Sequence, residues 1–172
     1  TFYNAVANGG QMMKPYLVSG TQRYGEILEE FPPTVVKRQI ASPNSIQLIR
    51  QLLEGVVNDG TAKKLKTDAY NFAGKTGTAQ INYKRTGTNI RIGGYRASFV
   101  GYFPAENPRY SCIVVIHRPR KAGFYGSDVA GPIFREVADK IMATGTNHQT
   151  PVNLAERPVM KNEALPGLDA GS

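Results

Sequence analysis

Tryptophan is absent from the 172 residues, and cysteine occurs once, at Cys112. A single cysteine excludes an internal disulfide and leaves the redox compartment open. Because Cys112 precedes the apolar run that ends at Ile116, we expect a buried, unreactive thiol. The two histidines, His117 and His148, lie in no pattern of further ligands. The sequence therefore predicts no metal site and no other cofactor.

Acidic residues are also scarce, with 13 Asp and Glu against 21 Lys and Arg, which gives a net charge of +8. This excess favours an acidic partner, such as nucleic acid, anionic lipid headgroups or an anionic cell-wall polymer. A basic nucleic-acid-binding module is one hypothesis that this charge suggests. No recognised nucleic-acid motif occurs, however, so we expect no nucleic-acid partner.

Long apolar runs are missing: none approaches the roughly 20 residues that span a bilayer, and no signal-peptide pattern opens the chain. We therefore expect any membrane anchor to lie outside this segment. The chain begins at Thr1 with an apolar pattern already running, which we interpret as a fragment or processed piece of a longer protein.

The first half of the chain predicts a helix end, two extended segments and one long helix. Residues 2–8 suit a helix end that Gly9 and Gly10 stop, with strands expected at 16–18 and 34–40. Ser42 and Pro43 form an N-cap and first helical position, and the following helix is expected to run to about Asn58 before Gly60 breaks it. Its apolar stripe consists of Ile46, Ile49, Leu52, Leu53 and Val56.

The second half predicts strands and a terminal helix. We expect strands at 72–81, 95–103 and 110–117, with the last two forming an antiparallel hairpin, and a polar, basic loop at 82–94. A terminal helix follows from an apolar stripe between Ile133 and Met142. Residues 1–143 are thus predicted to form one α+β unit, an antiparallel sheet flanked by helices, and residues 144–172 a tail or linker.

One motif in the first of these strands carries chemistry: Lys75-Thr76-Gly77 followed by Thr78. An edge strand can pair its backbone with an extended peptide, and Gly77 leaves room for that approach. The Lys75 ammonium and the hydroxyls of Thr76 and Thr78 suit a carboxylate, and the Thr78 backbone N–H could supply one donor to an oxyanion. The alternative is an exposed strand whose lysine protects the sheet edge from aggregation.

Further segments accompany this motif in a fixed order. They are 7–10 (ANGG) with Lys14-Pro15, 55–57 (GVV) with 60–62 (GTA), 74–79 (GKTGTA), 97–104 (ASFVGYFP), the strand at 110–117 and 125–134 (YGSDVAGPIF). In these segments residues 1–143 resemble the C-terminal half of the penicillin-binding protein transpeptidase domain, most closely the class B, cell-division kind. The implied fold is the C-terminal part of the penicillin-binding protein and serine β-lactamase-like transpeptidase fold.

The resemblance implies D-Ala-D-Ala transpeptidation of peptidoglycan stem peptides and β-lactam binding. It implies catalytic roles for Lys75 and the Thr78 backbone N–H, and substrate-binding roles for Thr76, Gly77 and Thr78. The family's Ser-x-x-Lys is absent, so no nucleophile is expected in this chain, which should be inactive alone. The chain contains Ser42-Pro43-Asn44, but in the family the Ser-x-Asn motif precedes the segment that corresponds to 7–10 (ANGG). Ser42 is therefore interpreted as a helix N-cap.

The implied partners are stem peptides, β-lactams, and divisome and glycan-polymerising membrane proteins. The implied location is periplasmic, with the full-length protein anchored in the cytoplasmic membrane. A non-catalytic β-lactam sensor or scaffold of the same fold remains the alternative, because the residues that would distinguish it from a transpeptidase are expected upstream of this segment. The basic cluster of Lys84, Arg85, Arg91 and Arg96 is either a solvated loop or a contact to glycan or a divisome partner.

Overall fold

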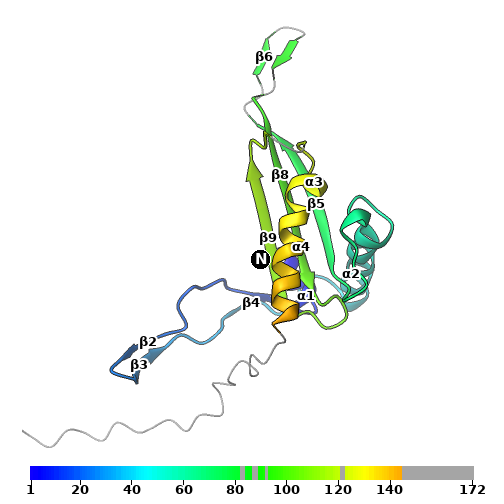
Figure 1. Ribbon diagram of the computed structural model, residues 1–172. Coiled ribbons are helices and arrows are strands. Elements are labelled where there is room, and N and C mark those ends of the chain that lie inside the picture. The colour runs from blue at the N-terminus through cyan, green and yellow to red at the C-terminus, as the bar shows by residue number, and fades with distance from the viewer. Residues whose placement is uncertain (82–83, 87–88, 92, 121–122, 145–172) are drawn as a thin grey trace, which may run out of the picture.

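The computed structural model describes residues 1–81, 84–86, 89–91, 93–120 and 123–144. Its centre is a three-stranded antiparallel sheet in the order β5-β8-β9 (Figure 1). The strands are β5 (Ala73–Gln80), β8 (Tyr95–Phe103) and β9 (Tyr110–His117), which confirms the three strands expected from the sequence. The β5–β8 ladder runs without a bulge from the Ala73–Tyr102 pair to the Gln80–Tyr95 pair.

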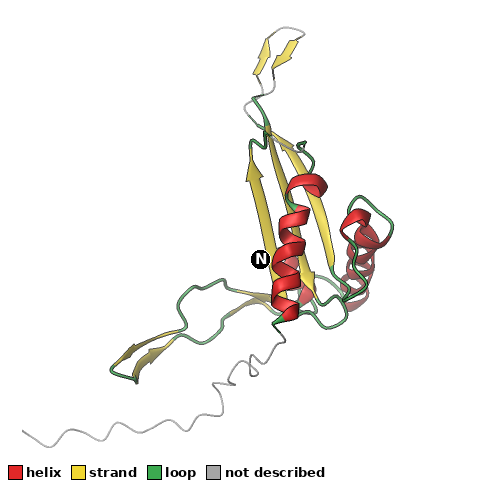
Figure 2. Cartoon of the chain, viewed as in Figure 1, coloured by secondary structure: helices red, strands yellow, loops and turns green. Residues whose placement is uncertain are grey.

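Two helices from the end of the chain cover one face of this sheet, which we term the α4 face. They are α3 (Gly126–Val129) and α4 (Gly131–Ala143), and Figure 2 shows α4 lying over the sheet and running along its strands. Alternate residues of β8 point to this face, where Phe99 and Phe103 are fully buried against Phe134 of α4. Gly101 lies between those two phenylalanines, and a methyl group there would approach the Phe134 ring to 3.1 Å.

The opposite face, which we term the Lys75 face, is covered at one end only. There α1 (Phe2–Ala7) and α2 (Pro43–Asn58) contribute Val6 and Leu53 to a small core that also contains Ala73, Tyr102 and Ala105. The predicted N-cap of α2 is confirmed, because the Ser45 N–H donates to Ser42 Oγ at 3.2 Å. A short 3-10 turn, η1 (Lys63–Leu65), follows α2.

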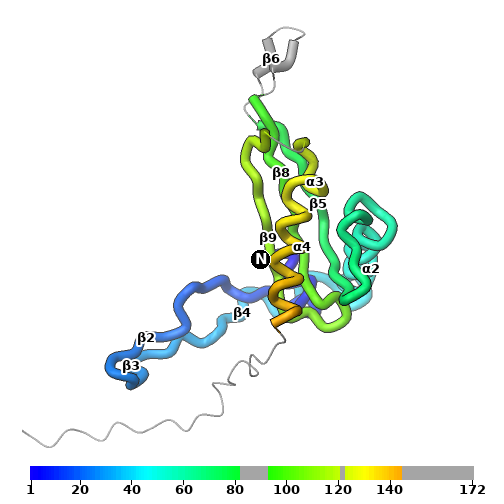
Figure 3. The backbone as a smooth tube through the Cα atoms, in the orientation of Figure 1, coloured from blue at the N-terminus to red at the C-terminus, as the bar shows by residue number. Residues whose placement is uncertain are grey.

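Three short ladders lie outside this sheet. β1 (Met12–Met13) pairs with β4 (Val35–Lys37), β2 (Gly20–Arg23) pairs with β3 (Glu26–Glu30), and β6 (Lys84–Thr86) pairs with β7 (Asn89–Arg91). The β2–β3 hairpin projects away from the sheet and helices (Figure 3). No residue of β2 or β3 is buried.

Several expectations from the sequence were wrong or incomplete. Residues 16–18 form no strand, since their apolar side chains are exposed and the pairing lies on either side of them. The expected loop at 82–94 contains the β6–β7 ladder, because backbone pairing needs no apolar pattern. Leu52 of the α2 stripe is 63% exposed, and Val57 is buried in addition to Ile46 and Leu53. The unit boundary at 143 stays a prediction.

Candidate substrate-binding site

The Lys75–Thr78 motif lies on β5, which is an edge strand of the sheet among the described residues. Residues paired across antiparallel strands share a face, so Thr76 (opposite Phe99) and Thr78 (opposite Ala97) belong to the α4 face. Lys75 and Gly77 belong to the Lys75 face. The Lys75 Nζ donates to the Thr76 carbonyl oxygen at 2.9 Å and lies 3.3 Å from Thr76 Oγ1. All four predicted site residues are therefore adjacent to one sheet edge.

The loop that follows α2 reaches the first threonine of the motif. Thr61 Oγ1 lies 3.1 Å from Thr76 Oγ1, and either hydroxyl can donate. The position of Thr61 is fixed by its neighbours, because Ala62 is fully buried and its N–H donates to the Val56 carbonyl oxygen at 3.0 Å. Sequence reasoning did not assign Thr61 to the site, although it noted the segment 60–62.

The first residue of α3 reaches the second threonine. The Gly126 N–H donates to Thr78 Oγ1 at 3.3 Å. This contact requires glycine at position 126, since a methyl group there would overlap the carbonyl oxygen of Ser98 and lie 2.8 Å from that of Gly77. On the Lys75 face of the same strand, a methyl group on Gly77 would meet the side chain of its partner residue Ser98. The glycine at position 126 thus allows α3 to contact the motif strand directly.

A salt bridge and hydrogen bonds join the loop after α2 to the terminal helices α3 and α4. Lys64, just after Thr61, forms a salt bridge with Asp128 of α3, and its hydrogen bond lowers the pKa of that carboxyl. Arg135 of α4 donates to the carbonyl oxygens of Leu65 at 2.7 Å and Lys66 at 3.1 Å. The loop after α2 is therefore held against the two terminal helices beside β5.

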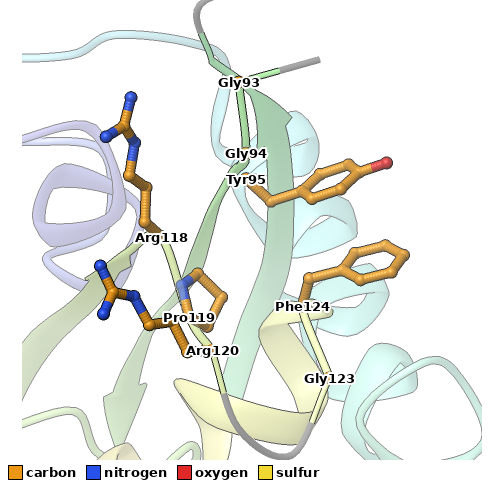
Figure 4. Close-up of a pocket in the computed structure, with 8 residues that line it drawn as sticks. All are labelled: Gly93, Gly94, Tyr95, Arg118, Pro119, Arg120, Gly123 and Phe124. Atoms are coloured by element: carbon orange, nitrogen blue, oxygen red, sulfur yellow. The ribbon is translucent and has the colours of Figure 1, made fainter. Parts of the chain in front are cut away.

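A hollow of about 480 Å³ lies at the end of the sheet beyond the motif (Figure 4). Tyr95, which pairs with Gln80 at the end of β5, stacks on Phe124 with ring centroids 4.1 Å apart and planes 13° apart. The ring of Tyr125 lies 4.5 Å from that of Phe124. Arg118 and Arg120 line the same hollow but point to the opposite side in Figure 4.

The remaining candidates show no second site among the described residues. No group of three possible metal ligands occurs in the part of the chain that the structure describes. His117 ends β9 and is exposed, whereas His148 lies outside the described residues. Cys112 is half-buried rather than buried, and burial raises the pKa of its thiol. The side chains of Lys84, Arg85 and Arg91 lie outside the description, so the basic cluster stays a prediction.

Comparison with known proteins identifies the family. The family model of the penicillin-binding protein transpeptidase domain matches residues 1–139. The chain belongs to this family. Among curated proteins it is 27% identical over 152 residues to a peptidoglycan D,D-transpeptidase FtsI homolog of Mesostigma viride, a match that covers 81% of this chain and 25% of that protein. The chain thus spans about a quarter of that relative's length.

Solved structures of penicillin-binding proteins show the same fold. The apo transpeptidase domain of penicillin-binding protein 3 from Burkholderia pseudomallei is 32% identical, with a TM-score of 0.59 over 87% of this chain and 42% of that one. Penicillin-binding protein A from M. tuberculosis, solved as a penicillin G acyl-enzyme complex, is 25% identical, with a TM-score of 0.63 over 81% of this chain and 30% of that one. These matches confirm the predicted α+β transpeptidase fold.

Proposed function

We propose that this chain supplies the carboxylate-binding edge of a serine-type D,D-transpeptidase, an enzyme that crosslinks peptidoglycan stem peptides and is acylated by β-lactams. The observation that carries this proposal is the placement of Lys75, Thr76 and Thr78 together on an edge strand. The family membership and the D,D-transpeptidase relative support it.

An extended peptide whose C-terminal end lies along β5 would meet a cation and two hydroxyl donors at its carboxylate. Lys75, Thr76 and Thr78 would hold that carboxylate, and the Thr78 backbone N–H would stabilise the oxyanion that forms at the scissile carbonyl. The stacked rings of Tyr95 and Phe124 would border the apolar part of the same ligand. A β-lactam carries its carboxylate in the corresponding position and would occupy the same edge.

The nucleophile has to come from outside these residues, since no serine in them is followed by lysine three positions later. In the reaction, a serine oxygen attacks the carbonyl of the penultimate D-alanine and the terminal D-alanine leaves with a proton. An amine of a neighbouring stem peptide then takes the acyl group and releases the serine. The chain alone is accordingly expected to form no acyl-enzyme.

The setting of the enzyme is part of the same proposal. No helix in the described part of the chain is long and apolar enough to cross a membrane. We propose that the full-length protein acts outside the cytoplasm, is anchored in the cytoplasmic membrane by another segment, and works with divisome and glycan-polymerising membrane proteins. Support comes from the family and from the excess of positive charge, which suits an anionic wall polymer.

Intact-mass measurement after incubation with benzylpenicillin tests this proposal. We expect one adduct on the full-length protein and none on this chain alone. An adduct on this chain would contradict the assignment of the nucleophile, and no adduct on the full-length protein would contradict its acylation by β-lactams.

A further inference from the structure

The hydroxyls of Thr76 and Thr78 can bind a carboxylate only as hydrogen-bond donors. A hydroxyl carries one proton and two acceptor lone pairs, and a carboxylate only accepts. Each threonine must therefore direct its single proton to the ligand. A neighbouring acceptor inside the protein would compete for that proton, whereas a neighbouring donor would leave it available.

At Thr78 the structure supplies a neighbour that can only donate. The Gly126 N–H lies 3.3 Å from Thr78 Oγ1 and occupies one of its lone pairs. This contact cannot consume the hydroxyl proton, which remains available at the edge of β5. Thr78 is exposed, so the proton is accessible to a ligand there.

At Thr76 the neighbour is Thr61, whose hydroxyl oxygen lies 3.1 Å away. The Lys75 ammonium, 3.3 Å from the same Thr76 oxygen, can only donate to it. An arriving carboxylate requires the Thr76 proton, so Thr61 must then donate to Thr76 rather than accept from it. A hydroxyl that accepts a hydrogen bond also donates a stronger one, so donation from Thr61 would strengthen the hydrogen bond from Thr76 to the carboxylate.

We propose that Thr61 is a positioning residue, whose hydroxyl donates to Thr76 Oγ1 and so directs the Thr76 proton toward the carboxylate of the bound ligand. Thr61 does not touch the ligand and acts only through Thr76. The inference rests on the proposed function, because it presupposes that the carboxylate binds at β5. The loop that carries Thr61 is held in place by buried Ala62 and Leu65 and by the Lys64–Asp128 salt bridge.

The test compares acylation rate constants of the full-length protein with benzylpenicillin and with its methyl ester, which lacks the carboxylate charge. For Thr61→Val we expect the rate with the acid to fall about fivefold, the equivalent of roughly 1 kcal/mol, while the rate with the ester stays unchanged. Thr61→Ser keeps the hydroxyl and is expected to retain the wild-type ratio of the two rates.

Thr34→Val is the matched control, since Thr34 is an exposed threonine and its side chain makes no hydrogen bond to another described residue. An unchanged rate with the acid in Thr61→Val would overturn the inference alone, with the proposed function intact. Equal falls for acid and ester would also overturn it, by giving Thr61 a purely structural role. A wild-type protein that neither compound acylates would instead overturn the proposed function.

Discussion

At the scale of single residues, Gly126 and Gly55 have opposite surroundings. A methyl group on Gly126 would overlap a backbone carbonyl of β8, whereas one on Gly55, inside α2, would meet nothing within 4 Å. We expect Gly126→Ala to destabilise the protein by about 1–3 kcal/mol because α3 has to move away from β5. Gly55→Ala should stabilise it by about 0.5–1 kcal/mol. Thermal unfolding of the full-length variants measures both, and equal effects would contradict the close contact at Gly126.

Asp139 is the residue whose titration should affect stability in acid. Burial on its own raises the pKa of this carboxyl, but hydrogen bonds from Arg135 at 2.7 Å and from the Tyr70 hydroxyl at 2.7 Å outweigh burial and lower it. A lowered pKa contributes stability above the unfolded value of about 3.9, and this contribution disappears as the pH falls through the folded value.

We therefore expect Asp139→Asn to unfold at a lower temperature than wild type near neutral pH, with the difference shrinking below about pH 4. Thermal unfolding over a pH series measures this difference. Glu136→Gln is the control, because its pair with Lys140 is exposed and should contribute little at any pH. A difference for Asp139→Asn that stays constant into acid would contradict the role of the carboxylate.

At the scale of elements, the sequence predicted the strands and helices that have a strong local signal. β8 and β9 are rich in apolar and β-branched residues and are separated by a proline-bounded connection, and Ser42-Pro43 begins α2. The strand expected at 34–40 contains β4, but its pairing with β1 and the β2–β3 ladder were not predicted, because these strands bury no side chain and so show no apolar alternation.

The candidate site was predictable only as far as its own strand. The contact between Thr61 and Thr76 joins residues 15 positions apart, and that between Gly126 and Thr78 joins residues 48 positions apart. No local pattern indicates such pairings. Nor does a local pattern indicate that Gly126 allows the close approach of α3 to the sheet.

The β2–β3 hairpin provides a prediction at this scale. Its two strands bury no residue, and its base is closed by a hydrogen bond from the Phe31 N–H to the Ser19 carbonyl oxygen at 2.8 Å. Replacing residues 20–30 with a short Gly-Ser linker in the full-length protein should leave the unfolding temperature and the benzylpenicillin acylation rate unchanged. A substantial fall in either would show that the hairpin supports the transpeptidase domain.

At the scale of the whole molecule, the two faces of the sheet differ in how they are covered. Lys75 pairs with Val100, which pairs in turn with Ile113, so these residues share the Lys75 face. Ile113 and its neighbour on that face, Val115, are 64% and 48% exposed. The α4 face, in contrast, buries its phenylalanines. The chain by itself thus exposes an apolar surface beside the candidate site.

We expect this chain to self-associate when it is produced alone, because association removes the exposed part of the Lys75 face from water. Sedimentation velocity measures the association. The double variant Ile113→Ser, Val115→Thr should reduce it, whereas Thr21→Ser on the projecting hairpin serves as a control that should not. A monomer that unfolds cooperatively would contradict this expectation.

The proposed activity is tested most directly by D-alanine release from a stem peptide that ends in D-Ala-D-Ala, with the full-length protein as catalyst. The account predicts release that stops after treatment with benzylpenicillin and that falls about a hundredfold in Lys75→Ala, since the substrate carboxylate loses its cation. Stoichiometric acylation by benzylpenicillin without any release of D-alanine would contradict it, and would make the protein a β-lactam sensor rather than a transpeptidase.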